Sequence, residues 1–154
     1  MPGGQAQLLW LIAALVVALA AITLAVVLRF RSRYRAAAQW ASTVLDADGV
    51  IRPFEKGVYR GTTATGYPAV KNNGRIALTR RRLVFVTLTG VRIEIPLAAI
   101  TALRQARSFN GSVVGGYTHL VVGTDTGEIA FFVPDLAAWL RDLGEASGVT
   151  PAPS

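Results

Sequence analysis

Nine arginine and lysine side chains are the residues of this sequence best suited to binding chemistry, and the ligand they suit is phosphate. They are Arg29, Arg31, Arg33 and Arg35 in one group, and Lys71, Arg75, Arg80, Arg81 and Arg82 in a second. Guanidinium groups bind phosphate oxygens through paired N–H donors. All nine are therefore candidate contacts for anionic lipid. The alternative roles are an orientation signal for the first group and a solvated turn that discourages edge-to-edge aggregation for the second.

Residues for other kinds of chemistry are sparse. His119 is the single histidine, it falls in a predicted strand, and the chain has no cysteine. The segment Asp125–Gly127 is typical of a hairpin turn, because the further oxygen ligands of a calcium loop are missing. Gly111–Gly116 lacks the Lys-Ser or Lys-Thr pair of a phosphate loop, and Gly61–Gly66 is more typical of a plain loop than of an anion cradle. We expect no enzymatic activity, no metal and no cofactor.

The element that must position these residues first is an apolar run from Leu8 to Leu28, free of charge, proline and glycine. As a helix it would extend roughly 31 Å, close to the hydrocarbon thickness of a bilayer. The competing interpretation is a cleaved secretory signal. A signal would carry a charged segment before a shorter apolar core, and residues 1–7 contain no Lys or Arg. The run therefore predicts a retained transmembrane helix, with the lipid bilayer as a partner.

The flanking charges predict the orientation of this helix. Four arginines follow the apolar run directly and none precedes it. The positive-inside rule then places residues 1–7 outside and the rest of the chain in the cytoplasm, as a single-pass protein of the cell membrane. Residues 29–48 form a basic juxtamembrane connector whose apolar positions recur three or four apart, which indicates a continuing helix. Asp46–Gly49 would end it.

Short strands and turns are predicted for residues 49–146. Strand patterns cover residues 75–79, 82–88, 91–95, 117–124 and 128–133. The alternation of Val91, Ile93 and Ile95 with charged neighbours is typical of a half-buried antiparallel strand. Apolar residues from Leu136 to Leu143 then follow a helical period, with Asp135 as the N-terminal cap and Gly144 as the stop. Residues 147–154 are predicted to be a disordered tail.

This order of elements resembles pleckstrin-homology-like domains, in which a C-terminal amphipathic helix closes a β sandwich or barrel. The resemblance to the GRAM branch of that superfamily lies in Gly74–Thr79, Arg82–Phe85 and Ile93–Leu97, followed by Ile100 and, more loosely, Trp139. It implies a non-enzymatic binding module. Lipid sites in the superfamily usually place basic residues on the first hairpin, whereas this chain carries them later.

Charge is distributed unevenly along the predicted domain. Residues 49–110 hold eleven Lys or Arg against two acids, a net of +9, whereas residues 111–154 hold one Arg against five acids, a net of −4. A tethered domain with one basic end is electrostatically inclined toward a negative leaflet. Nucleic-acid binding is not expected, because the tether explains the basicity and no basic and aromatic residues interleave as in stacking platforms.

Three functions remain open at this point. The favoured one is a cytoplasmic module for protein interaction or assembly at the membrane, with a membrane-protein partner or with copies of itself. The second is a peripheral module that recognises anionic lipids, which would depend on Arg80, Arg81 and Arg82. The third is an accessory subunit of a membrane transporter complex, since a single span does not form a pore.

Overall fold

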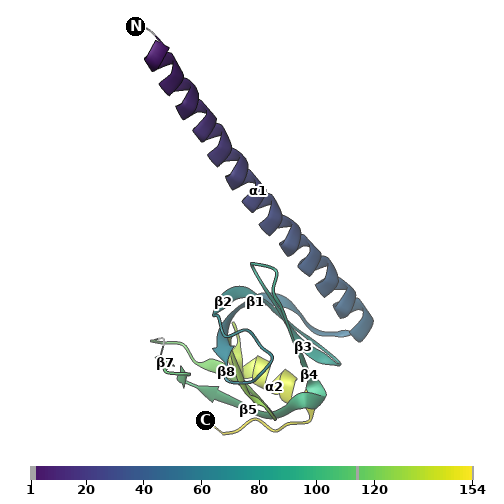
Figure 1. The fold of residues 1–154 in the computed structure, drawn as a ribbon. Coiled ribbons are helices and arrows are strands. Elements are labelled where there is room, and N and C mark those ends of the chain that lie inside the picture. The colour runs from purple at the N-terminus through teal and green to yellow at the C-terminus, as the bar shows by residue number, and fades with distance from the viewer. Residues whose placement is uncertain (1–2, 114, 154) are drawn as a thin grey trace.

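The computed structural model describes residues 3–113 and 115–153, and its first element is one unbroken helix. Helix α1 (Gly3–Asp48) has 46 residues and is about 69 Å long at the usual rise per residue. The run from Gln5 to Asp48 holds no glycine or proline that would interrupt it. It ends at Gly49, whose φ of 75° suits glycine and whose amide N–H donates to the Leu45 carbonyl oxygen. Figure 1 shows α1 as a straight rod with the rest of the chain gathered beside its C-terminal part.

The remaining chain forms a seven-stranded antiparallel sheet in the order β4-β3-β2-β1-β9-β8-β5. The strands are β1 (Val50–Thr62), β2 (Asn72–Thr79), β3 (Arg82–Thr87), β4 (Arg92–Pro96), β5 (Ile100–Ala106), β8 (His119–Thr124) and β9 (Gly127–Phe132). A short 3-10 turn, η1 (Leu97–Ala99), joins β4 to β5, and β6 (Ser108–Phe109) pairs with β7 (Ser112–Val113) as a separate hairpin. The sheet is not closed, because β4 and β5 are its two edges. This differs from the closed barrel that was one of the expected forms.

Two-residue connections make tight antiparallel hairpins of β2 with β3 and of β8 with β9. Between β2 and β3, the Thr79 hydroxyl accepts hydrogen bonds from the backbone N–H groups of Arg81 and Arg82. Between β8 and β9, Gly127 has a φ of 141°, which a side chain would resist. The mainly β architecture predicted from the sequence is confirmed, together with the strands expected around these turns. Strands β1 and β5 were not predicted.

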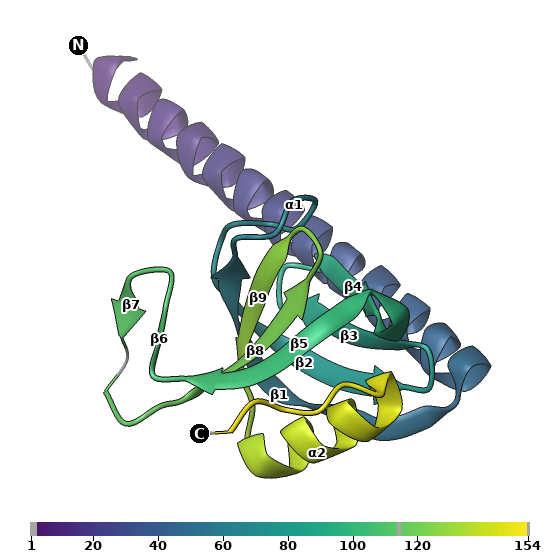
Figure 2. The ribbon, with the colours of Figure 1, turned by 90° about the horizontal axis from the view of Figure 1, so that it is seen from below.

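Helix α2 (Leu136–Ser147) covers the inner side of the curled sheet and completes the main core. Trp139 and Leu143 are fully buried in the main core, where α2 contacts β5 and β8, and in Figure 2 the helix runs along the lower side of the strands. The Asp135 side chain accepts a hydrogen bond from the Ala138 N–H, which confirms the predicted cap. The predicted stop at Gly144 is wrong, because the helix continues to Ser147 and ends at Gly148, with a φ of 74°.

Gly144 is instead a site of close approach between α2 and the C-terminal segment. A Cβ there would lie 3.0 Å from the Val149 carbonyl oxygen and 3.1 Å from the Pro151 ring. Further on, the Ala152 N–H donates to the Leu103 carbonyl oxygen of β5 at 2.8 Å. The described part of the segment thus packs along an edge strand, unlike the disorder predicted for residues 147–154.

Candidate functional site

The C-terminal part of α1 packs against the outer face of the sheet. Ala37 and Ala41, one helical turn apart, are each 1% exposed and lie on Val84 and Val86 of β3. Alanine at both positions lets the helix backbone approach the strand closely. Trp40, Val44 and Phe54 pack around this contact as partly buried side chains. The apolar stripe expected in the connector therefore serves to dock α1 on the sheet.

The β3–β4 turn fixes one end of this interface. A Cβ at Gly90, whose φ is 83°, would lie 2.9 Å from the Arg33 carbonyl oxygen, so only glycine fits there without displacement. Next to the turn, the Arg92 guanidinium lies 4.7 Å from the centre of the Trp40 ring. The turn is consequently held against α1 only five residues beyond Leu28, roughly 7.5 Å along the helix axis.

An ion pair fixes the other end. Arg82 Nε donates to the buried Asp48 carboxylate at 2.6 Å, and Arg82 Nη1 donates to Glu94 at 2.7 Å. The hydrogen bond to Glu94, followed by that to Asp48, raises the pKa of Arg82 despite partial burial. The neighbouring Arg80 N–H donates to the Gly49 carbonyl oxygen at 3.0 Å. The β2–β3 hairpin is thereby attached to the last turn of α1.

The structure separates the nine predicted basic residues instead of gathering them. Arg29, Arg31, Arg33 and Arg35 are exposed along α1, and Lys71 is exposed just before β2. Arg80 and Arg81 are exposed at the opposite end of the sheet, beside Gly49, which lies roughly 31 Å beyond Leu28 along the helix axis. Arg82 is engaged by two carboxylates. The expected five-residue cluster is therefore not one surface.

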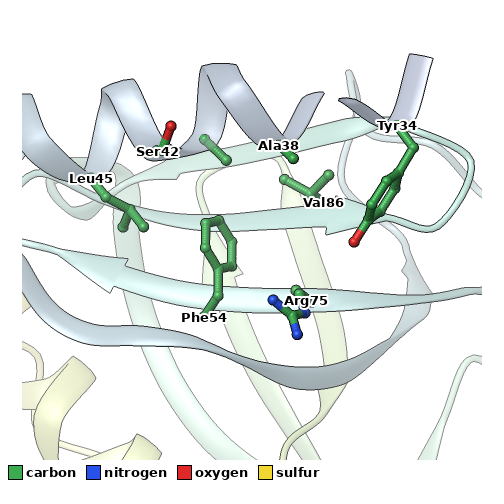
Figure 3. Close-up of a pocket in the computed structure, with 8 residues that line it drawn as sticks. Tyr34, Ala38, Ser42, Leu45, Phe54, Arg75 and Val86 are labelled. Carbon is green, nitrogen blue, oxygen red and sulfur yellow. The ribbon is translucent and has the colours of Figure 1, made fainter. Parts of the chain in front are cut away.

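Arg75 lies in a groove between α1 and the sheet, shown in Figure 3. The groove has a volume of about 180 Å³ and is lined by Tyr34, Ala38, Ala41, Ser42, Leu45, Phe54, Arg75 and Val86. Among these described lining residues, Arg75 alone carries a charge. Apolar walls beside one guanidinium would suit an apolar group with an acidic end. Because the groove belongs to the docking interface of α1, its occupant would also contact the helix that holds the domain.

The end of the sheet nearest the apolar run carries exposed apolar side chains that sequence reasoning missed. Val70, Leu88, Val91 and Tyr117 are 75%, 56%, 43% and 63% exposed. Together with Lys71, we call these residues the proximal surface. They come from three loops, which explains why no sequence pattern marked them.

Two contacts connect the loops of the proximal surface. The Asn72 side-chain N–H donates to the Thr89 hydroxyl at 3.2 Å, which joins the segment before β2 to the β3–β4 turn. Leu88 and Tyr117 line one groove of about 430 Å³ together with Lys56 and Phe132. The Tyr117 ring packs on Phe132 with ring centres 5.5 Å apart. The proximal surface is thus continuous.

A smaller mixed patch lies at the opposite end of the sheet. Val50 and Ile51 are 47% and 41% exposed at the start of β1, and Val50 pairs with Thr79 beside the exposed Arg80 and Arg81. We call Val50, Ile51, Arg80 and Arg81 the distal patch. Apolar side chains flanked by cations are suited to a protein surface that is apolar at its centre and acidic at its rim.

Ion pairs within the fold neutralise much of the uneven charge. Arg104 forms two hydrogen bonds to Glu128, at 2.8 and 2.7 Å, and these lower the pKa of Glu128. Arg52 bridges Glu55 and Asp142 with contacts of 2.8 and 2.6 Å, which ties β1 to α2. Several acids are therefore satisfied internally, and the exposed arginines and lysines dominate the surface field.

The single histidine has a packed position. His119 is fully buried, its ring lies 4.4 Å from the Phe132 ring centre, and its Nδ1 is 2.9 Å from the Ala106 carbonyl oxygen. Burial lowers its pKa below the usual value. His119 lies at the start of β8, so the strand predicted around it is present, and its side chain packs inside the fold.

A pair of arginine substitutions separates the roles of neighbouring hairpin residues. We expect Arg82→Met to lower the free energy of unfolding by about 1–3 kcal/mol, because it leaves the buried Asp48 carboxylate without its partner. Arg81→Met, at an exposed neighbour, should change it by less than about 0.5 kcal/mol. Urea unfolding of the full chain in detergent, followed by tryptophan fluorescence, measures both. Equal stability of the two variants would contradict a positioning role for Arg82.

Comparisons with known proteins add little to this geometry. No protein-family model matches the chain, and a comparison with curated proteins found no match. One similar solved structure is the crystal structure of the C-terminal domain of an unknown protein from Leishmania infantum. It is 15% identical, the alignment covers 71% of this chain and 95% of that chain, and the TM-score is 0.47. A similarity this low carries no inference about function.

Proposed function

We propose that this chain is a single-pass protein of the cell membrane that presents a cytoplasmic, pleckstrin-homology-like module for protein interaction or assembly, without enzymatic activity. The observation that carries the proposal is the continuity of α1. One helix passes without a break from the apolar run into the contact of Ala37 and Ala41 with the sheet. The domain is therefore held at a set height and rotation relative to the apolar segment.

Two features of α1 support anchoring and orientation. The helix is long and apolar enough to cross a membrane, and all the side chains from Leu8 to Leu28 are exposed. A globular domain in water would bury such a surface, whereas a bilayer solvates it. The arginines that begin at Arg29 lie only on the domain side of this run, which favours the domain in the cytoplasm.

The arrangement of the sheet domain supports the pleckstrin-homology-like assignment. Seven antiparallel strands curl around one core, and a C-terminal amphipathic helix places Trp139 and Leu143 into it. This is the architecture that the resemblance of Gly74–Leu97 to the GRAM branch implies.

The position of the arginine hairpin favours a protein partner over lipid for that site. With α1 upright in a bilayer, Arg80 and Arg81 lie roughly 31 Å beyond the apolar run, and a typical tilt of about 20° shortens this by only a few per cent. Screening at physiological salt acts over about 8 Å. The distal patch would instead meet a protein, either a membrane-protein partner or a second copy. An accessory subunit of a transporter complex would be one form of this role.

Site-specific photocrosslinking in native membranes tests the proposal. A photoreactive amino acid at Ile51, in the distal patch, is expected to give discrete protein adducts, at twice the chain mass if the partner is a second copy. The same probe at Glu145, exposed on α2, is the matched control. Adducts at Ile51 that disappear when Arg80 and Arg81 are both changed to Glu would support the acidic-partner interface. Absence of protein adducts at Ile51 would refute interaction through the distal patch.

A further inference from the structure

The proximal surface lies at the height where a bilayer interface would meet the domain. Gly90, between Leu88 and Val91, contacts Arg33, roughly 7.5 Å beyond the end of the apolar run. The polar headgroup layer on each side of a bilayer is itself about 5–8 Å thick. This inference rests on the proposed crossing of the membrane by α1. With α1 across the membrane, the contact of Gly90 with Arg33 places the β3–β4 turn in the headgroup layer.

The chemistry of the proximal surface matches that layer. Leu88, Val91 and Val70 are apolar and exposed, and Tyr117 exposes a ring that has an apolar body and a polar hydroxyl, as interfacial aromatic residues do. Lys56 lines the groove beside Leu88 and Tyr117, and Lys71 follows Val70 directly. Isolated exposed apolar residues are ordinary on soluble proteins. Here several of them lie together at one end of the sheet with cations beside them, and this indicates a binding surface.

The groove beside the turn extends this surface toward the centre of the sheet. Gly57, Gly74, Val58, Phe132 and Pro134 are among the residues that line it, and none of these five carries a charge. The Arg60 guanidinium lies 4.7 Å from the Phe132 ring centre, on the same side as Lys56. Cations around an apolar groove are complementary to anionic headgroups around lipid chains.

We propose that the proximal surface is a second contact with the membrane, in which Val70, Leu88, Val91 and Tyr117 enter the interfacial layer of an anionic leaflet. Lys56 and Lys71 meet the phosphates of its headgroups. The domain then lies against the bilayer instead of hanging from α1 alone. The distal patch points away from the membrane and stays accessible to a partner.

Depth-dependent quenching in lipid nanodiscs tests this contact with the full chain. Because the chain has no cysteine, single labelling sites are available at Leu88→Cys and, as the distal control, Ile51→Cys. Each variant carries an NBD fluorophore and is placed in discs of phosphatidylcholine with phosphatidylglycerol, or of phosphatidylcholine alone. A fraction of the lipid carries a nitroxide near the headgroup. We expect at least threefold stronger quenching at position 88 than at 51 in the anionic discs.

A second comparison tests whether Lys56 and Lys71 contribute to the membrane contact. In the anionic discs, changing Lys56 and Lys71 to Ser should reduce quenching at position 88 at least twofold, and raising the salt should act in the same direction. The control removes two exposed positive charges at the distal end by changing Arg80 and Arg81 to Ser. This change should leave the quenching at position 88 unchanged. Equal quenching at 88 in neutral and anionic discs would overturn the headgroup contact.

The two proposals fail in different ways. If the chain is retained in the discs but positions 88 and 51 are quenched equally in the anionic lipid, the proximal contact is overturned while anchoring stands. If the chain does not remain with the discs after purification, anchoring by α1 is wrong and the proposed function falls with it.

Discussion

Replacing Gly74 by alanine is expected to lower the thermal unfolding temperature of the sheet domain by about 10–20 °C. Gly74 pairs with Gly57 of β1 and with Thr87 of β3, in the middle of three strands. A Cβ there would overlap the Val86 carbonyl oxygen and would lie 2.7 Å from a ring carbon of Phe85. The backbone of β2 must shift to relieve this, at a cost of about 2–3 kcal/mol.

The matched control for this substitution is Gly115→Ala. A Cβ at Gly115 meets no atom within 4 Å, so the same chemical change is made without a clash. Circular dichroism of the full chain in detergent, recorded against temperature, measures both variants. If Gly74→Ala and Gly115→Ala unfold within about 2 °C of each other, the tight three-strand contact at Gly74 is not as described.

Replacing Ala41 by glutamate is expected to detach the end of α1 from the sheet while leaving the main core folded. The residue is 1% exposed against Val84 and Val86, and a carboxylate on this apolar contact would lose its hydration and force the helix away from the strand. The main core, around Phe85 and Trp139, belongs to a separate cluster and does not include Ala41. Ala41→Glu should therefore release α1 from the sheet without unfolding the main core.

Spin labels on exposed sites of the two parts measure this detachment. Labels at Arg35→Cys on α1 and Thr101→Cys on β5 should give one narrow distance distribution by electron–electron double resonance in nanodiscs. With Ala41→Glu we expect that distribution to broaden at least twofold. Gln39→Glu, the same charge on the exposed side of α1, is the control and should leave it narrow. A narrow distribution in both variants would show that the alanine contact does not hold the domain.

Local patterns were sufficient for elements that alternate cleanly or end in a short turn. The β2–β3 and β8–β9 hairpins are of this kind, since Thr79 and Gly127 mark their turns. Strand β1 was missed because Pro53 and Gly57 interrupt its pattern and its register shifts three times along its pairs. Gly144 was misread as a stop because the reason for that glycine is contact with a segment five to seven residues later.

The candidate site was less predictable because it depends on contacts between distant residues. Arg80, Arg81 and Arg82 are neighbours in sequence, yet Arg82 is bound to Asp48, 34 residues earlier. No local pattern reveals that partner. The proximal surface likewise draws one or two residues from each of three loops, and its height relative to the apolar run follows only from the contact of Gly90 with Arg33.

Because α1 is unbroken, the orientation of the sheet domain follows the tilt of the transmembrane segment. A helix that tilts to match a thinner bilayer would carry the docked sheet with it, because no hinge lies between Leu28 and Ala41. At roughly 31 Å from the apolar run, the distal patch would swing sideways by about 5 Å for every 10° of tilt. Bilayer thickness would thereby set where the patch meets its partner.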